Sequence, residues 1–302
     1  VLDSTDEQIA EAAACAAGAD VCVAVLGDQA GLFGRGTSGE GCDAADLRLP
    51  GRQEDLLEAL IATGTPVVLV LLVGRPYELS RQIDRLAAVL CGFFPGQRGA
   101  EALAAVLSGR VNPSGRLPVS FPAAGSSQPS TYLAPRLGLR SEVSTVDPTP
   151  LFPFGHGLSY APATWVGVTA ESDSWPTDGT CALTVTLRND GTIPTSEVVQ
   201  VYLHDPVAQV SRPEQYLVAA PRVDLAPGEQ RTLRIDLHAD QASYTGIDLQ
   251  RRVDHGAVEL RVGPSSADHR AIIRVQMTGS ARIVGPDRVL EPTASPQTGG
   301  RA

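Results

Sequence analysis

The chain has 302 residues, a formal net charge of −10 and a hydrophobic fraction of 43%. This length allows two domains, and the hydrophobic fraction is ordinary for a globular protein. The negative charge repels phosphate groups, so the composition argues against nucleic acids and anionic membrane surfaces as partners. No apolar run reaches the ~18 residues that a membrane-spanning helix needs, so no membrane insertion is expected.

The first residues of the chain do not resemble a secretion signal. Residues 1–4 (Val-Leu-Asp-Ser) contain neither a basic stretch nor an apolar segment, and no initiator Met precedes them. We therefore expect a processed or excised piece of a longer polypeptide. A cytoplasmic location is favoured for it but not fixed.

The first 110 residues alternate between two periodicities. Residues 5–19 have helical spacing of apolar residues, and residues 20–26 are a continuous apolar run typical of a strand buried on both faces of a parallel sheet. After a glycine-rich loop over 28–51, the pattern continues with a helix at 52–63, a strand at 66–73, a helix at 78–86, a strand at 87–94 and a helix at 99–108. Such alternation predicts an α/β domain, a partial α/β sandwich with a mostly parallel sheet.

The second half of the chain changes character. Seven prolines interrupt residues 115–160, which favours an irregular connection. Short alternating strands with turn residues between them then predict a β-sandwich of the immunoglobulin or fibronectin type III kind. Those strands are expected at 181–188, 198–203, 230–237 and 257–262. The predicted organisation is an α/β domain over 1–120, a linker over 121–162, a β-sandwich over 163–278 and a disordered tail over 279–302.

The glycine-rich loop is the strongest candidate for a functional site. It follows a buried parallel strand, at the carboxyl edge where open α/β sheets bind their ligands. Glu40 stands between two glycines, so neighbouring side chains would not block a bulky ligand. Its position fits a general acid/base, but spacing alone favours a solvated glutamate in a flexible loop.

Two other interpretations of this loop are weaker. Residues 34–39 match the G-x-G-x-x-G pattern of dinucleotide sites, but that pattern must lead directly into a helix, and here further loop residues intervene. Cys42 as a nucleophile would need a histidine base, and the nearest in sequence is His156. The five cysteines show no zinc-ligand spacing.

Several segments, in this order, resemble the second and third domains of family 3 β-glycosidases. The sugar-site signature of that family is similar to residues 38–41 (Ser-Gly-Glu-Gly) together with Asp43. The other similar segments are residues 47–53, 112–118 (Asn-Pro-Ser-Gly-Arg-Leu-Pro), 152–160 (Phe-Pro-Phe-Gly-His-Gly-Leu-Ser-Tyr), 198–202 (Val-Val-Gln-Val-Tyr) and 224–229. Together they extend over nearly the whole chain to about residue 278, and the ordered set is far more specific than any single tetrapeptide.

The resemblance implies a retaining glycoside hydrolase that acts on terminal β-linked glucose or xylose of glucosides, xylosides or oligosaccharides. In that family an Asp of a barrel domain is the nucleophile, and Glu40 matches the second-domain acid/base. Asp28, Phe33, Arg35 and Asp43 are candidates for lining the sugar site, with structural support of the loop as an equal alternative for each. No metal or organic cofactor is implied.

The chain also departs from the family pattern. The barrel domain with its nucleophile is missing, so we expect it in the same polypeptide or in a partner chain. The second domain starts late, and a sheet without its first strands would expose an apolar edge. A different interpretation is an inactive carbohydrate-binding or scaffold module. The sequence leaves glucosidase and xylosidase specificity, the oligomeric state and the activity of the isolated chain open.

Overall fold

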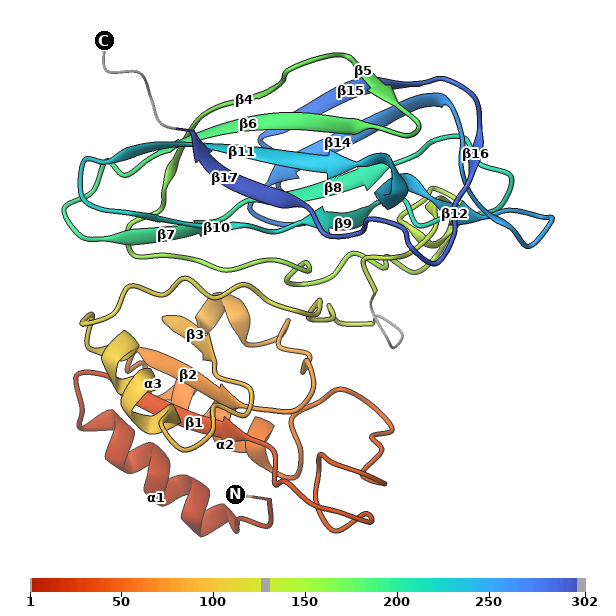
Figure 1. Cartoon of the computed structure of the whole chain (residues 1–302). Coiled ribbons are helices and arrows are strands. Elements are labelled where there is room, and N and C mark those ends of the chain that lie inside the picture. Colours follow the sequence, from red (N-terminus) through yellow and green to blue (C-terminus); the bar gives the residue numbers. More distant parts are fainter. Residues whose placement is uncertain (1, 126–130, 298–302) are drawn as a thin grey trace. The chain divides into compact units, whose positions relative to one another are not determined.

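The computed structural model describes residues 2–125 and 131–297, which form two compact units (Figure 1). The first unit consists of Val1–Val111, Ser120–Ser130 and Thr145–Phe152, and the second of Asn112–Val119, Thr131–Ser144 and Pro153–Ala302. The predicted linker over 121–162 is thus divided between the units, and its residues 126–130 lie outside the described part. The predicted domain boundaries stay a prediction.

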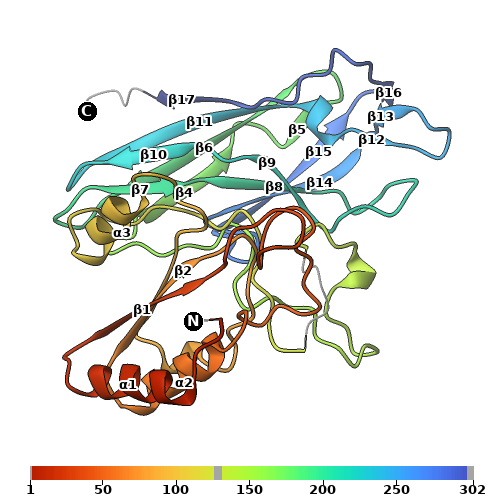
Figure 2. The ribbon, with the colours of Figure 1, turned by 90° about the horizontal axis from the view of Figure 1, so that it is seen from below.

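The first unit is built on a three-stranded parallel sheet in the order β1-β2-β3. Its elements are α1 (Asp6–Ala17), β1 (Cys22–Gly27), α2 (Gln53–Ala62), β2 (Val67–Leu72), β3 (Ala88–Cys91) and α3 (Gly99–Leu107). The α1 helix begins with a capping box, in which Thr5 and Gln8 satisfy each other's backbone N–H groups. Figure 2 shows α1 and α2 together on one side of the sheet and α3 on the other. None of the helices in the described residues combines the length and apolar character that a membrane crossing requires.

The expectation that the first strand is buried on both faces is wrong. β1 is an edge strand, and only its Ala24 and Leu26 side are buried. On the other side Val21, Val23 and Val25 are 49%, 47% and 54% exposed. A sheet without its first strands was expected to expose an apolar edge. β1 is that edge strand, and the side of it that carries Val21, Val23 and Val25 is exposed.

The helix predicted over 78–86 is also wrong, since only Ile83–Arg85 forms a short 3-10 helix. One tertiary and one local hydrogen bond hold the preceding residues in another conformation. The Glu78 N–H donates to the Leu47 carbonyl at 2.7 Å, and the Ser80 N–H donates to the Glu78 carboxylate at 2.5 Å. Because these amides are already engaged, the local helical pattern is overridden.

The second unit is a β-sandwich with a four-stranded sheet, β17-β11-β6-β4, and a five-stranded sheet, β5-β15-β14-β8-β9. Smaller sheets join β10 with β7 and β12 with β13 and β16. The strands are β4 (Thr164–Ala170), β5 (Ser174–Pro176), β6 (Thr180–Arg188), β7 (Thr195–Val198), β8 (Gln200–His204), β9 (Tyr216–Ala219), β10 (Arg222–Leu225), β11 (Gln230–His238), β12 (Tyr244–Thr245), β13 (Arg251–Val253), β14 (Gly256–Gly263), β15 (Ala271–Thr278), β16 (Arg282–Ile283) and β17 (Thr293–Gln297). Two further 3-10 helices span Arg136–Gly138 and Ala239–Ala242.

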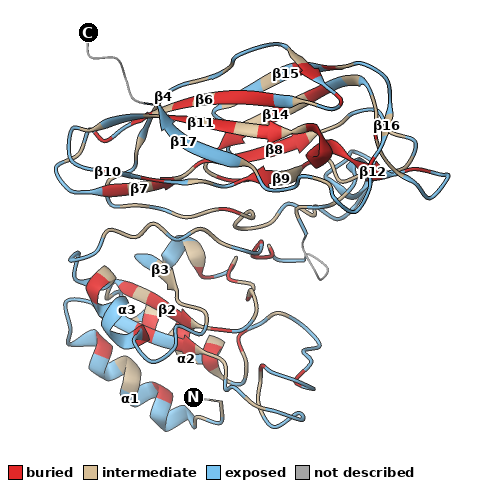
Figure 3. Ribbon diagram, in the orientation of Figure 1, coloured by how far each residue is buried: buried red, intermediate tan, exposed pale blue. Residues whose placement is uncertain are grey.

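Alternate residues of the two main sheets meet in one apolar core. Trp175, Leu183, Val201, Ile235 and Leu260 are each 0% exposed within it. Figure 3 shows the buried residues concentrated on β6, β8, β11 and β14. The predicted fold class, an α/β domain followed by an all-β sandwich, is confirmed.

The predicted disorder of residues 279–302 does not hold where the structure describes them. β16 lies in this stretch, and β17 pairs antiparallel with the edge of β11. Two buried side chains hold the segment that leads into β17. Asp240 accepts from the Val289 N–H at 2.9 Å, and Gln241 donates to the Leu290 carbonyl at 2.8 Å. An edge strand tolerates a proline such as Pro296. Residues 298–302 lie outside the described part.

Candidate functional site

The carboxyl ends of the three parallel strands gather the residues of the candidate site. Asp28 follows β1, Gly74 follows β2 and Phe94 follows β3, each within three residues of its strand. A Cβ placed on Gly74 would come within 2.1 Å of Ser38 Oγ and 2.8 Å of the Phe94 ring, so both side chains lie directly against Gly74. This is the edge at which parallel sheets bind ligands.

Asp28 is engaged in hydrogen bonds on both of its carboxylate oxygens. Oδ1 accepts from the Thr37 hydroxyl at 2.7 Å and from the Tyr77 hydroxyl, and Oδ2 accepts from the Gly74 N–H at 2.8 Å. Its backbone N–H donates to the Leu72 carbonyl at 2.8 Å. Asp28 thus joins the Glu40 loop to the segment that follows β2.

The segment before Glu40 folds back on itself. The Gly31 N–H donates to the Ser38 carbonyl at 2.9 Å, and the Thr37 N–H donates to the Gln29 carbonyl at 2.8 Å. Gly39 has φ +131°, and a Cβ there would lie 1.8 Å from the Gly31 oxygen. No other residue type fits this position, so the glycine before Glu40 is required by close backbone contact.

Glu40 is exposed, and among the described residues its carboxylate has no hydrogen-bond or ion-pair partner. Its backbone is held instead, because its carbonyl accepts from the Gly34 N–H at 3.4 Å. Two residues further on, Arg75 Nη2 donates to the Cys42 carbonyl at 2.6 Å. A free carboxylate is thus presented to solvent from a segment whose backbone is fixed on both sides.

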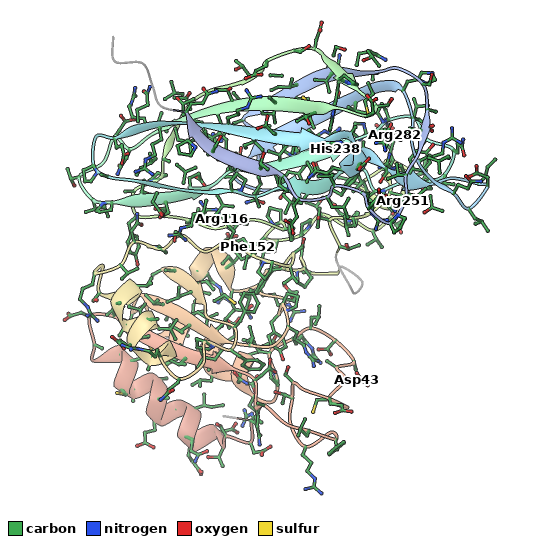
Figure 4. The ribbon with its side chains drawn as sticks, viewed as in Figure 1. Asp43, Arg116, Phe152, His238, Arg251 and Arg282 are labelled. Atoms are coloured by element: carbon green, nitrogen blue, oxygen red, sulfur yellow. The ribbon has the colours of Figure 1, made fainter. Side chains whose placement is uncertain are left out.

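The remaining predicted site residues are exposed on the same loop. Phe33 is 78% exposed and has φ +55°, an uncommon backbone conformation for a bulky residue. Figure 4 labels Asp43 on the part of the loop that extends beyond the strand ends. Within the described part of the chain, no hydrogen bond or ion pair engages the side chain of Arg35 or Asp43. The structure therefore brings Phe33, Arg35 and Asp43 onto the Glu40 loop without bonding them together.

Sequence reasoning missed Thr37, Gly74, Tyr77 and Phe94. Tyr77 is 2% exposed, and burial, followed by its hydrogen bond to Asp28, raises its pKa. Tyr77 and Asp28 are 49 residues apart in sequence, so no local pattern links them. The available signal was topological: segments that follow adjacent parallel strands meet at one edge of the sheet.

The two weaker interpretations of the loop gain nothing from the structure. α2 begins only at Gln53, so no helix N-terminus follows the 34–39 pattern to bind a phosphate. Cys42 is 5% exposed, and all five histidines, including His156, belong to the second unit. Across residues 2–125 and 131–297, no cluster of His, Cys, Asp and Glu has the composition of a metal site.

Comparison with known proteins gives two family matches. The model for the glycosyl hydrolase family 3 C-terminal domain matches residues 3–160. The model for a fibronectin type III-like domain matches residues 197–266, which confirms the predicted type of sandwich.

Individual relatives agree with these matches. A β-xylosidase of Formosa agariphila is 36% identical over 269 residues, covering 88% of this chain and 36% of the relative. A β-glucosidase of Rhizobium radiobacter is 36% identical over 304 residues, covering 95% of this chain and 35% of the relative. The crystal structure of a Listeria innocua β-glucosidase in complex with glucose superposes with a TM-score of 0.82 at 30% identity, covering 92% of this chain and 39% of that one. The chain thus spans little more than a third of the length of these relatives.

Proposed function

The chain belongs to glycosyl hydrolase family 3, and we propose that it supplies the general acid/base, Glu40, of a retaining β-glycoside hydrolase. The substrates would be terminal β-D-glucosyl or β-D-xylosyl residues of small glycosides or oligosaccharides. The nucleophile would come from a barrel domain in the same polypeptide or in a partner chain. No metal or organic cofactor is needed for this chemistry.

The observation that supports this role most strongly is the state of the Glu40 carboxylate. It is exposed, it has no partner among the described residues, and it lies between two glycines at the carboxyl edge of the sheet. A carboxyl group that must give a proton to one oxygen and later take a proton from another needs such free access. A purely structural glutamate would instead use its oxygens as Asp28 does.

The proposed reaction has two steps. In the first, a barrel carboxylate bonds to the anomeric carbon while the glycosidic C–O bond breaks, and the proton of the Glu40 carboxyl goes to the leaving oxygen. In the second, the Glu40 carboxylate takes a proton from water, the water oxygen bonds to the anomeric carbon, and the barrel carboxylate leaves. This chemistry requires the two carboxyl groups about 5–5.5 Å apart.

Two observations support the need for further polypeptide. The relatives named as β-glucosidase and β-xylosidase are nearly three times as long as the matched region. In addition, the bare valine face of β1 borders an unpaired strand edge, the kind of surface that natural proteins cover. A right-handed crossover connection would bring a strand preceding α1 to this edge of β1, because α1 packs beside α2 on the same side of the sheet.

The test uses the chain together with a family 3 barrel domain, and compares Glu40→Ala with the unchanged protein. The variant should still cleave dinitrophenyl glycosides in the first step, because dinitrophenolate leaves without protonation. It should then stall, since no base activates water. Azide, which attacks the anomeric carbon without a base, should restore turnover and give a β-glycosyl azide.

Undiminished hydrolysis of alkyl glycosides by Glu40→Ala would refute the acid/base role. If instead the unchanged chain binds sugars but no barrel domain restores hydrolysis, the alternative of an inactive carbohydrate-binding or scaffold module is favoured. Parallel assays with glucosides and xylosides decide the sugar.

A further inference from the structure

We propose that Asp28 is a positioning residue that holds the Glu40 loop in its working geometry. The proposal rests on the assignment of Glu40 as the acid/base. It goes beyond that assignment by naming the group that fixes where the acid/base stands, and by moving Asp28 out of the set of sugar ligands.

The carboxylate of Asp28 joins three segments that are distant in sequence. Thr37 belongs to the Glu40 loop, Gly74 lies two residues after the end of β2, and Tyr77 lies three residues further on. Thr37 uses the same hydroxyl to accept from the Gln29 N–H at 2.9 Å, so both sides of the loop are tied to Asp28. Hydrogen bonds to an ionised carboxylate are about twice as strong as neutral ones.

The position of Asp28 makes this network a clamp on Glu40. Asp28 is anchored to the sheet through its own N–H and the Leu72 carbonyl, so the carboxylate is a fixed point. Thr37 stands three residues before Glu40, and Ser38 between them packs against Gly74. Arg75 then fixes the Cys42 carbonyl two residues after Glu40. Displacement of Thr37 would therefore displace the acid/base.

The same contacts argue against Asp28 as a ligand of the sugar. Oδ1 accepts from two hydroxyl groups and Oδ2 accepts from a backbone N–H. A sugar hydroxyl at Oδ1 would have to displace the hydroxyl of Thr37 or that of Tyr77, which is 2% exposed. Leaving such a buried donor unsatisfied is unfavourable.

A first experiment tests the clamp on the 302-residue chain alone, with the thiol of Cys42 as reporter. Cys42 is 5% exposed, Cys15 is exposed and serves as the reactive reference, and the half-buried Cys91 in β3 reports on unfolding of the first unit. Alkylation by iodoacetamide is followed for each cysteine-containing peptide by mass spectrometry.

Asp28→Asn is the main variant, because it keeps the side-chain shape but replaces one acceptor oxygen by a donor. We expect the alkylation rate of Cys42 to rise about tenfold or more relative to Cys15, because losing a hydrogen bond to a charged group shifts a local opening equilibrium by about that factor. Cys91 should be unaffected. Asp20→Asn is the matched control: the same chemical change on an exposed residue before β1, without a side-chain partner in the described chain.

A second experiment measures catalysis with the barrel domain present. Asp28→Asn should lower kcat/KM for alkyl glycosides about 100-fold, the cost of a misplacement of roughly 1 Å. The loss should be much smaller for dinitrophenyl glycosides, whose leaving group needs no acid. Tyr77→Phe removes one hydroxyl and keeps the buried ring, so it should show the same dependence on the leaving group with a smaller loss of kcat/KM. If Asp28 had a merely structural role, kcat/KM would fall by the same factor for both classes of substrate.

The outcomes separate this proposal from the function on which it rests. Unchanged Cys42 reactivity in both Asp28→Asn and Tyr77→Phe overturns the clamp, whatever the activity. Raised Cys42 reactivity with equal losses for both classes of substrate overturns the positioning role. If the first unit does not fold in Asp28→Asn, which Cys91 alkylation would reveal, Tyr77→Phe decides alone. If the rate of glycoside cleavage by Glu40→Ala depended neither on the leaving group nor on added azide, the proposed function would instead be refuted.

Discussion

The three-stranded sheet of the first unit and the main sheets of the second unit bury their apolar residues in different ways. In the sandwich, two sheets face each other, and residues such as Leu183 and Ile235 are 0% exposed. In the first unit β2 is covered, with Leu69 and Leu71 at 0% exposed, whereas Val23 and Val25 of the neighbouring β1 are about half exposed. The sandwich is therefore complete within this chain, while the parallel sheet has a face and an edge that more polypeptide would cover.

The largest effect should come from cutting into the sandwich core. Leu183→Ala should lower the free energy of unfolding of the second unit by about 4 kcal/mol, through lost burial and the cavity left behind. Both tryptophans, Trp165 and Trp175, lie in this unit, so urea unfolding followed by tryptophan fluorescence reports on it alone.

The matched variant on the parallel sheet is Val25→Ala, which should change the stability of the first unit by less than about 0.5 kcal/mol in the 302-residue chain. Calorimetry of the chain would measure it. If the free energy of unfolding fell as much as in Leu183→Ala, the β1 face would already be covered. The two units would then not differ in how they bury their apolar residues.

A somewhat smaller effect is expected at the buried ion pair of the second unit. Arg116 Nη2 lies 2.5 Å from Glu197 Oε1, with the two side chains 9% and 7% exposed (Figure 4). Glu197→Ala leaves the guanidinium buried without its partner and should lower stability by about 3 kcal/mol. The exposed pair Arg98–Glu101 is the control, since Glu101→Ala should cost at most about 1 kcal/mol. Equal losses of stability at the two pairs would contradict the claim that burial makes the Arg116–Glu197 pair costlier to break.

A smaller, pH-dependent effect should distinguish the units, because every histidine lies in the second one. Burial first, and then the charge of Arg116, lowers the pKa of His156; burial and then Arg261 lower the pKa of His269. The unfolded chain takes up these protons near pH ~6.5 while the folded unit does not, so stability is present above that pH and falls as the pH drops below it. Urea unfolding by tryptophan fluorescence at several pH values measures the slope, and His156→Gln should flatten it. A slope that persists in the His156→Gln, His269→Gln double variant would point to other groups.

Substitutions on the bare face of β1 should change the folded state least, but they should measurably change self-association in solution. Replacing Val23 and Val25 by Thr preserves side-chain shape and strand propensity while making this face polar. The 302-residue chain should then self-associate less at high concentration, as measured by light scattering. Unchanged association would mean that molecules meet through another surface.

The sequence predicted the order of strands and helices in the first unit and the type of sandwich in the second, because apolar periodicity reflects local burial. It could not predict the bare face of β1, since the run from Val21 to Leu26 looks the same whether or not a neighbour covers it. It also predicted a helix where Glu78 is held by a tertiary hydrogen bond to Leu47 and Ser80 by a local one to Glu78.

The candidate site was also only partly predictable from the sequence. The glycine neighbours of Glu40 and its place after a parallel strand made it a candidate, the resemblance to family 3 β-glycosidases gave it the acid/base role, and that role stays a prediction. The contacts of Asp28 with Gly74 and Tyr77 were not predictable, since they join positions 46 and 49 residues apart. Such contacts follow from how strand ends meet in the sheet and not from any local pattern.

The central claim is that this chain holds the acid/base but not the nucleophile. The most direct measurement is hydrolysis of p-nitrophenyl β-glucoside and β-xyloside by the purified 302-residue chain, beside its Glu40→Gln variant. The account predicts no turnover by either protein until a barrel domain is added. Turnover by the chain alone that Glu40→Gln abolishes would contradict it, because both catalytic carboxyl groups would then lie within these residues.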